Sequence, residues 1–127
     1  MQLDENNYKE QINAFTLKDW QPLIELIPEI ESTLKFNDSY IVSKFHEVAY
    51  NLPIIISFDW GDWHEGQEIV KNEGFDLNAI DVPTKCKLIT AIVRNDRFCE
   101  GALNSAFESG LILRILKSIE KQVTNVN

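Results

Sequence analysis

Two short segments of the sequence hold the side chains whose types and spacing could support binding or chemistry. The first, FDWGDWHEGQE at residues 58–68, places two tryptophans among four carboxylates and a histidine. The second, DRFCEGALNSAFESG at residues 96–110, puts an arginine and two glutamates on one stripe of an expected helix. A cleft between the two segments would suit a small ligand, because rings stack on it while charged groups orient it. The candidate ligand-binding residues are Asp59, Trp60, Trp63, Arg97, Glu100 and Glu108.

The same segments give little support to metal or catalytic chemistry. No second histidine lies at ligand spacing from His64, and Asp62 and Glu65 are explained as residues that start a helix, so we predict no metal site. The sequence has no nucleophile elbow, phosphate-binding loop or dinucleotide glycine motif, so we predict no catalytic residue and no cofactor. Trp60 and Trp63 are three residues apart, and anchoring the core from one helical face is an alternative to ligand stacking.

The role of the second segment depends on what happens at Gly110. Apolar residues from 98 to 110 share one helical face, whereas those from 111 to 119 lie about a third of a turn further round. If one helix continued through Gly110, Arg97, Glu100 and Glu108 would run into a buried face, where charge is costly unless paired. If the helix breaks there, the stripe is ordinary solvated surface. We predict a break or kink at Gly110.

Hydrophobic periodicity predicts helices along most of the chain. Helical spacing recurs after Thr16, from Ile41 to Leu52, from Asp62 to Val70, and around Leu88 to Val93. In the segment around Leu88, Lys87, Thr90 and Arg94 lie on the helical face opposite the apolar one. In the helix after Thr16, Pro28 should bend or end the helix. We therefore predict an all-α, compact bundle of about five to six helices. Residues 1–127 form a single domain in this interpretation, with fraying at 1–14 and 122–127.

Residues 54–58, IIISF, are the one stretch with strand character. Because the sequence offers no second strand, we interpret this stretch as an extended, buried connector. The alternative is that it pairs with its own copy across a homodimer, since an exposed strand edge recruits another strand.

Composition excludes some partners and compartments. Twenty acidic and 12 basic residues give a net charge of −8, which argues against a nucleic-acid-binding surface. The acidity suits solubility, with an acidic surface for a basic partner as the alternative. Cys86 and Cys99 are too few for a disulfide framework, the first ten residues lack an apolar signal region, and no apolar run could span a bilayer. We predict a cytoplasmic protein that binds neither membrane nor nucleic acid.

Several motifs resemble those of a bacterial family called domain of unknown function family 6508. They are FDWxxW from Phe58, DRFxEGxL from Asp96 and AFESG from Ala106, within a resemblance that covers roughly residues 17–119. The resemblance implies a small helical domain, and it brings no reaction, cofactor or catalytic residue.

Three functions are compatible with these observations. We favour a small non-enzymatic binding or protein-interaction domain, whose partner is another protein or a second copy of the chain. The first alternative is a small-ligand-binding or hydrolytic domain, with a cleft between the FDWGDW segment and the DRFCEG and AFESG segments. The second is an acidic inhibitor or immunity-type protein that covers a basic partner.

Overall fold

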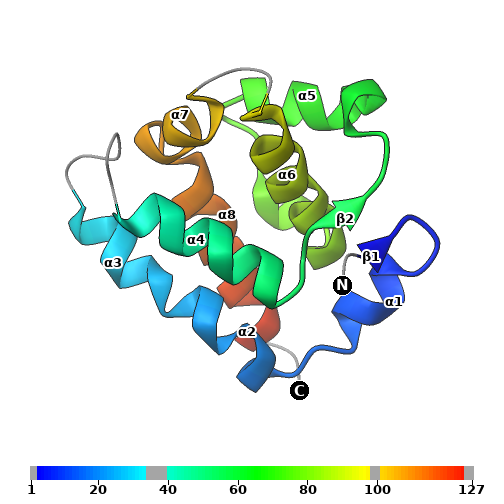
Figure 1. Ribbon diagram of the computed structural model, residues 1–127, viewed down its shortest axis with the longest axis horizontal. Helices are drawn as coiled ribbons and strands as arrows, with labels where there is room; N and C mark the ends of the chain where they lie inside the picture. The colour runs from blue at the N-terminus through cyan, green and yellow to red at the C-terminus, as the bar shows by residue number, and fades with distance from the viewer. Residues whose placement is uncertain (1–2, 34–39, 98–100, 125–127) are drawn as a thin grey trace.

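Shorter helices surround two longer ones, Val82–Asn95 and Leu111–Thr124, which pack against each other (Figure 1). The computed structural model describes residues 3–33, 40–97 and 101–124. The prediction of a mainly helical fold is confirmed. The α-helices are α1 (Tyr8–Asn13), α2 (Leu17–Ile24), α3 (Leu26–Ser32), α4 (Tyr40–Asn51), α5 (His64–Lys71), α6 (Val82–Asn95), α7 (Ala102–Glu108) and α8 (Leu111–Thr124). Two 3-10 turns, η1 (Trp60–Asp62) and η2 (Leu77–Ala79), and two short strands, β1 (Leu3–Asp4) and β2 (Ile56–Ser57), complete the described elements.

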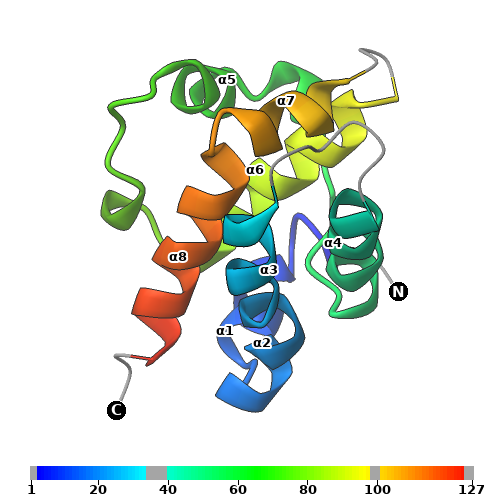
Figure 2. The ribbon, with the colours of Figure 1, turned by 90° about the vertical axis from the view of Figure 1, so that its left-hand side faces the viewer.

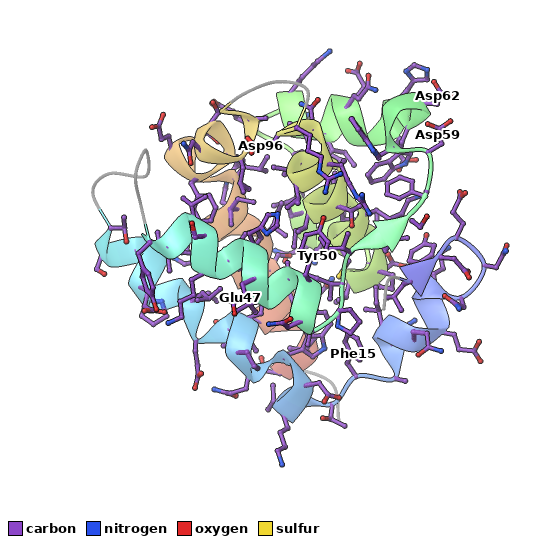
Figure 3. All side chains as sticks on the ribbon, viewed as in Figure 1. Phe15, Glu47, Tyr50, Asp59, Asp62 and Asp96 are labelled. Carbon is purple, nitrogen blue, oxygen red and sulfur yellow. The ribbon has the colours of Figure 1, made fainter. Side chains whose placement is uncertain are left out.

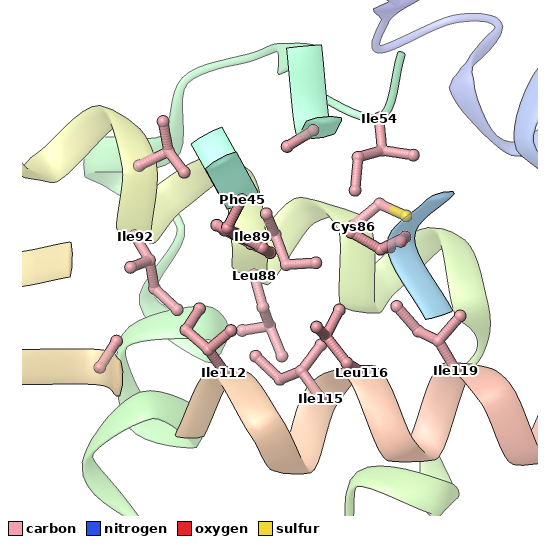
Figure 4. Close-up of a cluster of buried hydrophobic side chains, with 14 of the residues drawn as sticks. Phe45, Ile54, Cys86, Leu88, Ile89, Ile92, Ile112, Ile115, Leu116 and Ile119 are labelled. Carbon is pink, nitrogen blue, oxygen red and sulfur yellow. The ribbon is translucent and has the colours of Figure 1, made fainter. Parts of the chain in front are cut away.

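Helix α6 lies at the centre of the core. It contacts α1, α5, α7, α8, η1 and β2, so it is buried on more than one face. Figure 4 shows the side of α6 that meets α8, where isoleucines and leucines of the two helices interdigitate. Phe45 of α4 and Phe107 of α7 close this core with an edge-to-face contact at 5.4 Å between ring centroids. Burial of these apolar surfaces is the main source of stability, at about 25 cal/mol per Å².

Helices α2 and α3 pack against α8, and α4 packs against α2, α3 and α7. In Figure 2, α3 lies between α8 and α4, in agreement with its contacts to both helices. The chain reaches this position through a break at Glu25, between α2 and α3. Pro28, which was expected to bend or end a helix, lies in the first turn of α3, and it has no N–H for the carbonyl of Ile24 that a continuous helix would require. A proline is tolerated there because the first backbone N–H groups of a helix have no intrahelical partner.

The segment at residues 54–58 has a partner that the sequence did not reveal. Ile54, Ile55 and Ile56 are buried, and β2 pairs in parallel with β1 in the register Leu3 with Ile56. The prediction that the stretch lacks a partner within the chain was therefore wrong, and the reason for expecting a strand-paired homodimer no longer holds. Residues 1–14, where fraying was predicted, contain both β1 and α1.

The predicted break at Gly110 is confirmed. Helix α7 ends at Glu108, α8 begins at Leu111, and Gly110 between them has a φ of +85°. Glycine adopts this left-handed conformation without the steric cost that a β-carbon imposes. The direction of the chain therefore changes between the two helices, which explains why their apolar faces are out of phase.

Candidate functional site

The two tryptophans of the FDWGDW segment line a pocket beside the central helix. The pocket has a volume of about 280 Å³ and lies between η1 and α5 on one side and the C-terminal half of α6 on the other. Both tryptophans are half-buried, so their rings form walls that remain accessible. The complete lining, which we call the tryptophan pocket, is Trp60, Trp63, Gly66, Gln67, Val70, Lys71, Ala91, Ile92 and Asn95.

Trp63 is held in place by a cluster of rings around a lysine. Its ring meets Phe58 edge to face, with 5.6 Å between centroids. The ammonium group of Lys87 lies 4.6 Å from the centroids of both rings and 5.6 Å from that of Tyr8. A cation within about 6 Å of a ring face is attracted by the ring's quadrupole. Lys87 therefore links the N-terminal segment, the end of β2 and the wall of the tryptophan pocket.

Gly66 provides the space that Trp63 occupies on α5. A β-carbon added at Gly66 would lie only 2.2 Å from Cε3 of Trp63 and 2.4 Å from its Cζ3. The indole ring therefore packs directly against the backbone of α5, in a position that no larger residue at 66 permits. The glycine and the lysine together fix the ring before any ligand arrives.

Two carboxylates flank Trp60 in the chain, although neither lines the tryptophan pocket. Asp59 precedes η1 and Asp62 ends it, and Figure 3 shows the two side chains close together on the same side of the molecule. A hydrogen bond with Asp62 and the negative charge of Asp62 raise the pKa of Asp59 above its ordinary value. Both residues are exposed, and among the described residues neither takes part in an ion pair. The η1 turn thus carries two exposed carboxylates beside the wall residue Trp60 in the chain.

The structure brings together only part of the predicted site. Asp59, Trp60 and Trp63 are neighbours, as their sequence spacing requires, but Arg97 and Glu108 are exposed and do not line the tryptophan pocket. Glu100 lies outside the described residues, as does Cys99. The break at Gly110 makes the stripe containing Arg97 and Glu108 a solvated surface, which is the outcome that the sequence analysis attached to a broken helix.

Asp96 has a structural role in the second segment. Its Oδ1 accepts a hydrogen bond from the backbone N–H of Leu103 at 3.0 Å, which joins the end of α6 to the first turn of α7. In Figure 3, Asp96 lies well apart from Asp59 and Asp62, so these aspartates belong to different parts of the surface.

A buried lysine on α6 was missed by the sequence analysis. Lys85 is fully buried, and its Nζ donates a hydrogen bond to Oε1 of Gln122 on α8. Burial lowers the pKa of Lys85 to about 8, because the charged form loses its hydration. One signal was available: Lys85 lies three and four residues before Leu88 and Ile89, on the apolar face of the same helix.

A second, larger concavity adjoins this lysine. It has a volume of about 780 Å³ and is lined by residues of the α1–α2 region, the η2–α6 junction and the end of α8. Gln122 and Asp81 belong to its lining, whereas Trp20 and Ile12 in its wall are almost completely buried. Much of the apolar lining is therefore already covered by the chain itself.

The described residues were also compared with the requirements for metal binding and for membrane spanning. Among them, no group of three or more histidine, cysteine, aspartate and glutamate side chains is placed to hold a metal ion. None of the helices in the described part combines the length and the apolar character needed to cross a membrane.

Residues 34–125 match the model of a family of unknown function, DUF6508. The chain belongs to DUF6508. This confirms the resemblance to that family, and the FDWGDW, DRFCEG and AFESG segments all lie within the matched range. No curated protein and no solved structure matches the chain.

The match also distinguishes the two concavities. All the residues that line the tryptophan pocket lie within the part matched to DUF6508. One wall of the larger concavity, at residues 12–20, lies outside it. The tryptophan pocket is therefore formed entirely by residues of the DUF6508 region.

Proposed function

We propose that this protein is a non-enzymatic binding domain that holds one apolar side chain or ring of its partner in the tryptophan pocket. The observation that carries the proposal is the placement of Trp60 and Trp63 as half-buried walls of a pocket on the central helix. Tryptophan is enriched at the centres of binding interfaces because it contributes a large contact area with few rotatable bonds.

The size of the tryptophan pocket favours a single side chain over a whole metabolite. Its volume of about 280 Å³ lies just below the range of ordinary ligand sites, which begins at about 300 Å³. Val70, Ala91 and Ile92 give it apolar surface that a phenyl or alkyl group can cover. A partner would therefore insert one anchoring residue and make its other contacts on the surrounding surface.

The lining of the tryptophan pocket supports binding rather than hydrolysis. Its polar members are Gln67, Lys71 and Asn95, which include no carboxylate, hydroxyl or thiol. Hydrolysis by general acid and base needs a titratable pair within reach of the substrate. Arg97 and Glu108, which the hydrolytic alternative would need in the cleft, are on exposed surface outside the pocket.

The preformed position of Trp63 also favours a binding role. Phe58, Gly66 and Lys87 hold the ring where it forms a wall. A rigid wall lowers the entropic cost of association, because the side chain does not need to be ordered when the partner arrives.

The proposal is tested by titrating the ¹⁵N-labelled protein with N-acetyl-phenylalaninamide, a neutral mimic of one anchoring side chain. The three indole N–H resonances report separately, because Trp60 and Trp63 line the tryptophan pocket whereas Trp20 lines the larger concavity. We expect saturable shifts for Trp60 and Trp63 and none for Trp20.

Two variants that introduce the same ring at different places provide the control. Ala91→Phe fills the tryptophan pocket and should abolish the shifts, whereas Ala79→Phe places its ring on an exposed position of η2 and should preserve them. The proposed function is wrong if the probe leaves Trp60 and Trp63 unchanged, or if Ala91→Phe binds it as well as Ala79→Phe does.

A further inference from the structure

We propose that the rings of Tyr8, Phe58 and Trp63 form a binding site for a trimethylammonium group, and that the ammonium group of Lys87 occupies this site until such a ligand displaces it. We call the three rings the aromatic cage. The cage takes a different ligand from the tryptophan pocket, although the ring of Trp63 belongs to both sites.

The aromatic cage already contains a cation, which is supplied by the chain itself. The ammonium nitrogen of Lys87 lies 4.6 Å from the ring centroids of Phe58 and Trp63, and 5.6 Å from that of Tyr8. All three distances lie within about 6 Å, the range in which the negative face of a ring attracts a positive charge. The cage therefore has the dimensions to hold an alkylammonium group.

The rings stabilise the charge of Lys87 but leave its N–H groups without acceptors. A lysine ammonium has three N–H donors. Among the residues that the structure describes, none forms a hydrogen bond or an ion pair with the ammonium group of Lys87. A trimethylammonium group has no N–H, so it gains the same attraction and loses no hydrogen bond to water when it enters. The cage is therefore better suited to trimethylammonium than to lysine.

The walls of the aromatic cage are held by contacts that do not involve Lys87. Tyr8 is buried on α1, which packs against α6. Phe58 meets Trp63 edge to face at 5.6 Å, and the ring of Trp63 packs on the backbone of α5 at Gly66. The rings should therefore keep their places when the lysine side chain leaves. A ligand that enters does not have to order them, which lowers the entropic cost of binding.

The surroundings of Lys87 allow one cation to replace another. Lys87 is half-buried, and its ammonium group is carried by a flexible four-carbon stem. Burial raises the pKa of Tyr8, and the nearby negative charges of Asp81 and Glu5 raise it further. Both acids are exposed, so the approach to the cage is negatively charged. Such a field favours a cation over a neutral ligand of the same shape.

The test is a titration of the ¹⁵N-labelled wild type and of Lys87→Ala with choline chloride at constant ionic strength. We expect saturable shifts of the Trp63 indole N–H, none at Trp20, and nuclear Overhauser effects from the choline methyl groups to the rings of Tyr8 and Phe58. Lys87→Ala should bind choline roughly three- to thirtyfold more tightly, because the competing cation is absent. The wild type should give the same shifts at higher choline concentrations, so the test does not depend on the folding of a variant.

Two controls separate the cation from its shape and the cage from other rings. The neutral isostere 3,3-dimethylbutanol should bind Lys87→Ala more weakly than choline does. In the Lys87→Ala background, Phe58→Leu should weaken choline binding at least about threefold, because it removes one wall of the cage. Phe15→Leu is the matched change, since Phe15 is also half-buried but packs on Trp20, and it should leave choline binding unaltered.

A second probe, N-acetyl-trimethyllysine amide, identifies the source of the trimethylammonium group. Tighter binding of this probe indicates a methylated protein partner, and tighter binding of choline indicates a small molecule; either result supports the site. The proposal is overturned if neither probe shifts Trp63 in the wild type or in Lys87→Ala. It is also overturned if dimethylbutanol binds as tightly as choline, or if Phe58→Leu binds choline as well as Phe15→Leu does. These results leave the proposed function intact, because that function is tested by a neutral phenyl probe and by Trp60.

Discussion

Replacing Gly66 with alanine should displace the ring of Trp63 and destabilise the protein. The new β-carbon would lie 2.2 Å from Cε3 of Trp63, so the ring must withdraw by about 1.2 Å to reach an ordinary contact of 3.4 Å. Phe58 and Lys87 pack on other parts of this ring, so withdrawal disturbs their contacts as well. Overpacking of this kind typically costs about 1–3 kcal/mol, and the better helix propensity of alanine returns up to about 1 kcal/mol. We expect a net loss of about 1–2 kcal/mol.

Urea unfolding and near-ultraviolet circular dichroism measure the two consequences of Gly66→Ala. For 127 residues, the expected loss corresponds to a decrease in Tm of roughly 4–7 °C. The aromatic dichroism should change because the surroundings of Trp63 change. Gly74→Ala is the matched control, since its β-carbon would meet its nearest neighbour, Oδ1 of Asn72, at 3.5 Å. The packing argument is refuted if Gly66→Ala is as stable as the control and leaves the aromatic dichroism unaltered.

Substitutions at three further positions test other parts of the structure. Burial lowers the pKa of Lys85 to about 8, so between pH 8 and 10 the native state binds fewer protons than the unfolded chain and the wild type gains stability with pH. Between pH 8 and 10, the free energy of unfolding of the wild type should rise by up to about 2 kcal/mol relative to that of Lys85→Met, measured by urea unfolding at each pH. If the free energies of the two proteins instead change in parallel with pH, the buried position of Lys85 is contradicted. Thr90→Val should lower the free energy of unfolding by about 1–3 kcal/mol in urea unfolding, because the Thr90 hydroxyl accepts a hydrogen bond from the buried N–H of Ile56 at 3.1 Å. Thr90→Ser keeps the hydroxyl and should lower it less. Gly110→Ala should lower the free energy of unfolding by roughly 1 kcal/mol because of the φ of +85°, and an unchanged value would argue against this conformation.

The helical part of the fold could be predicted because its signals are local. The periodicity of apolar residues indicates α4, α6 and α8 from segments of a dozen residues each, and the phase change at Gly110 locates the break between α7 and α8. Thr16 was also recognised as a helix start, and its hydroxyl accepts from the backbone N–H of Asp19 in a capping box. Each of these features depends on residues within four positions of one another.

The features that could not be predicted depend on residues distant in the chain. Leu3 pairs with Ile56 across more than fifty positions, and two residues in a polar N-terminal segment give no strand signal. Thr90 was placed on the polar face of its helix, yet it is buried where β2 crosses α6. A helix in contact with neighbours on several sides does not keep one polar face, so its periodicity misleads.

The candidate site was likewise predictable only where its residues are close together in the sequence. Asp59, Trp60 and Trp63 lie on one turn and its continuation, so their proximity follows from the sequence alone. Whether Arg97 and Glu108 lie near that turn depends on how α6 and α7 are oriented, and no local sequence pattern determines this orientation. The contribution of Lys87 was also hidden, because a lysine on the expected polar face gives no sign that three rings surround its ammonium group.

The most direct test of the binding role is the detection of intermolecular nuclear Overhauser effects from the phenyl protons of N-acetyl-phenylalaninamide to the protein. The proposed function predicts contacts with the rings of Trp60 and Trp63 and with the methyl group of Ala91, which together line the tryptophan pocket. Contacts with Phe15 and Trp20 instead would place the probe in the larger concavity and contradict the proposed function. The absence of any contact at saturating probe would contradict it as well.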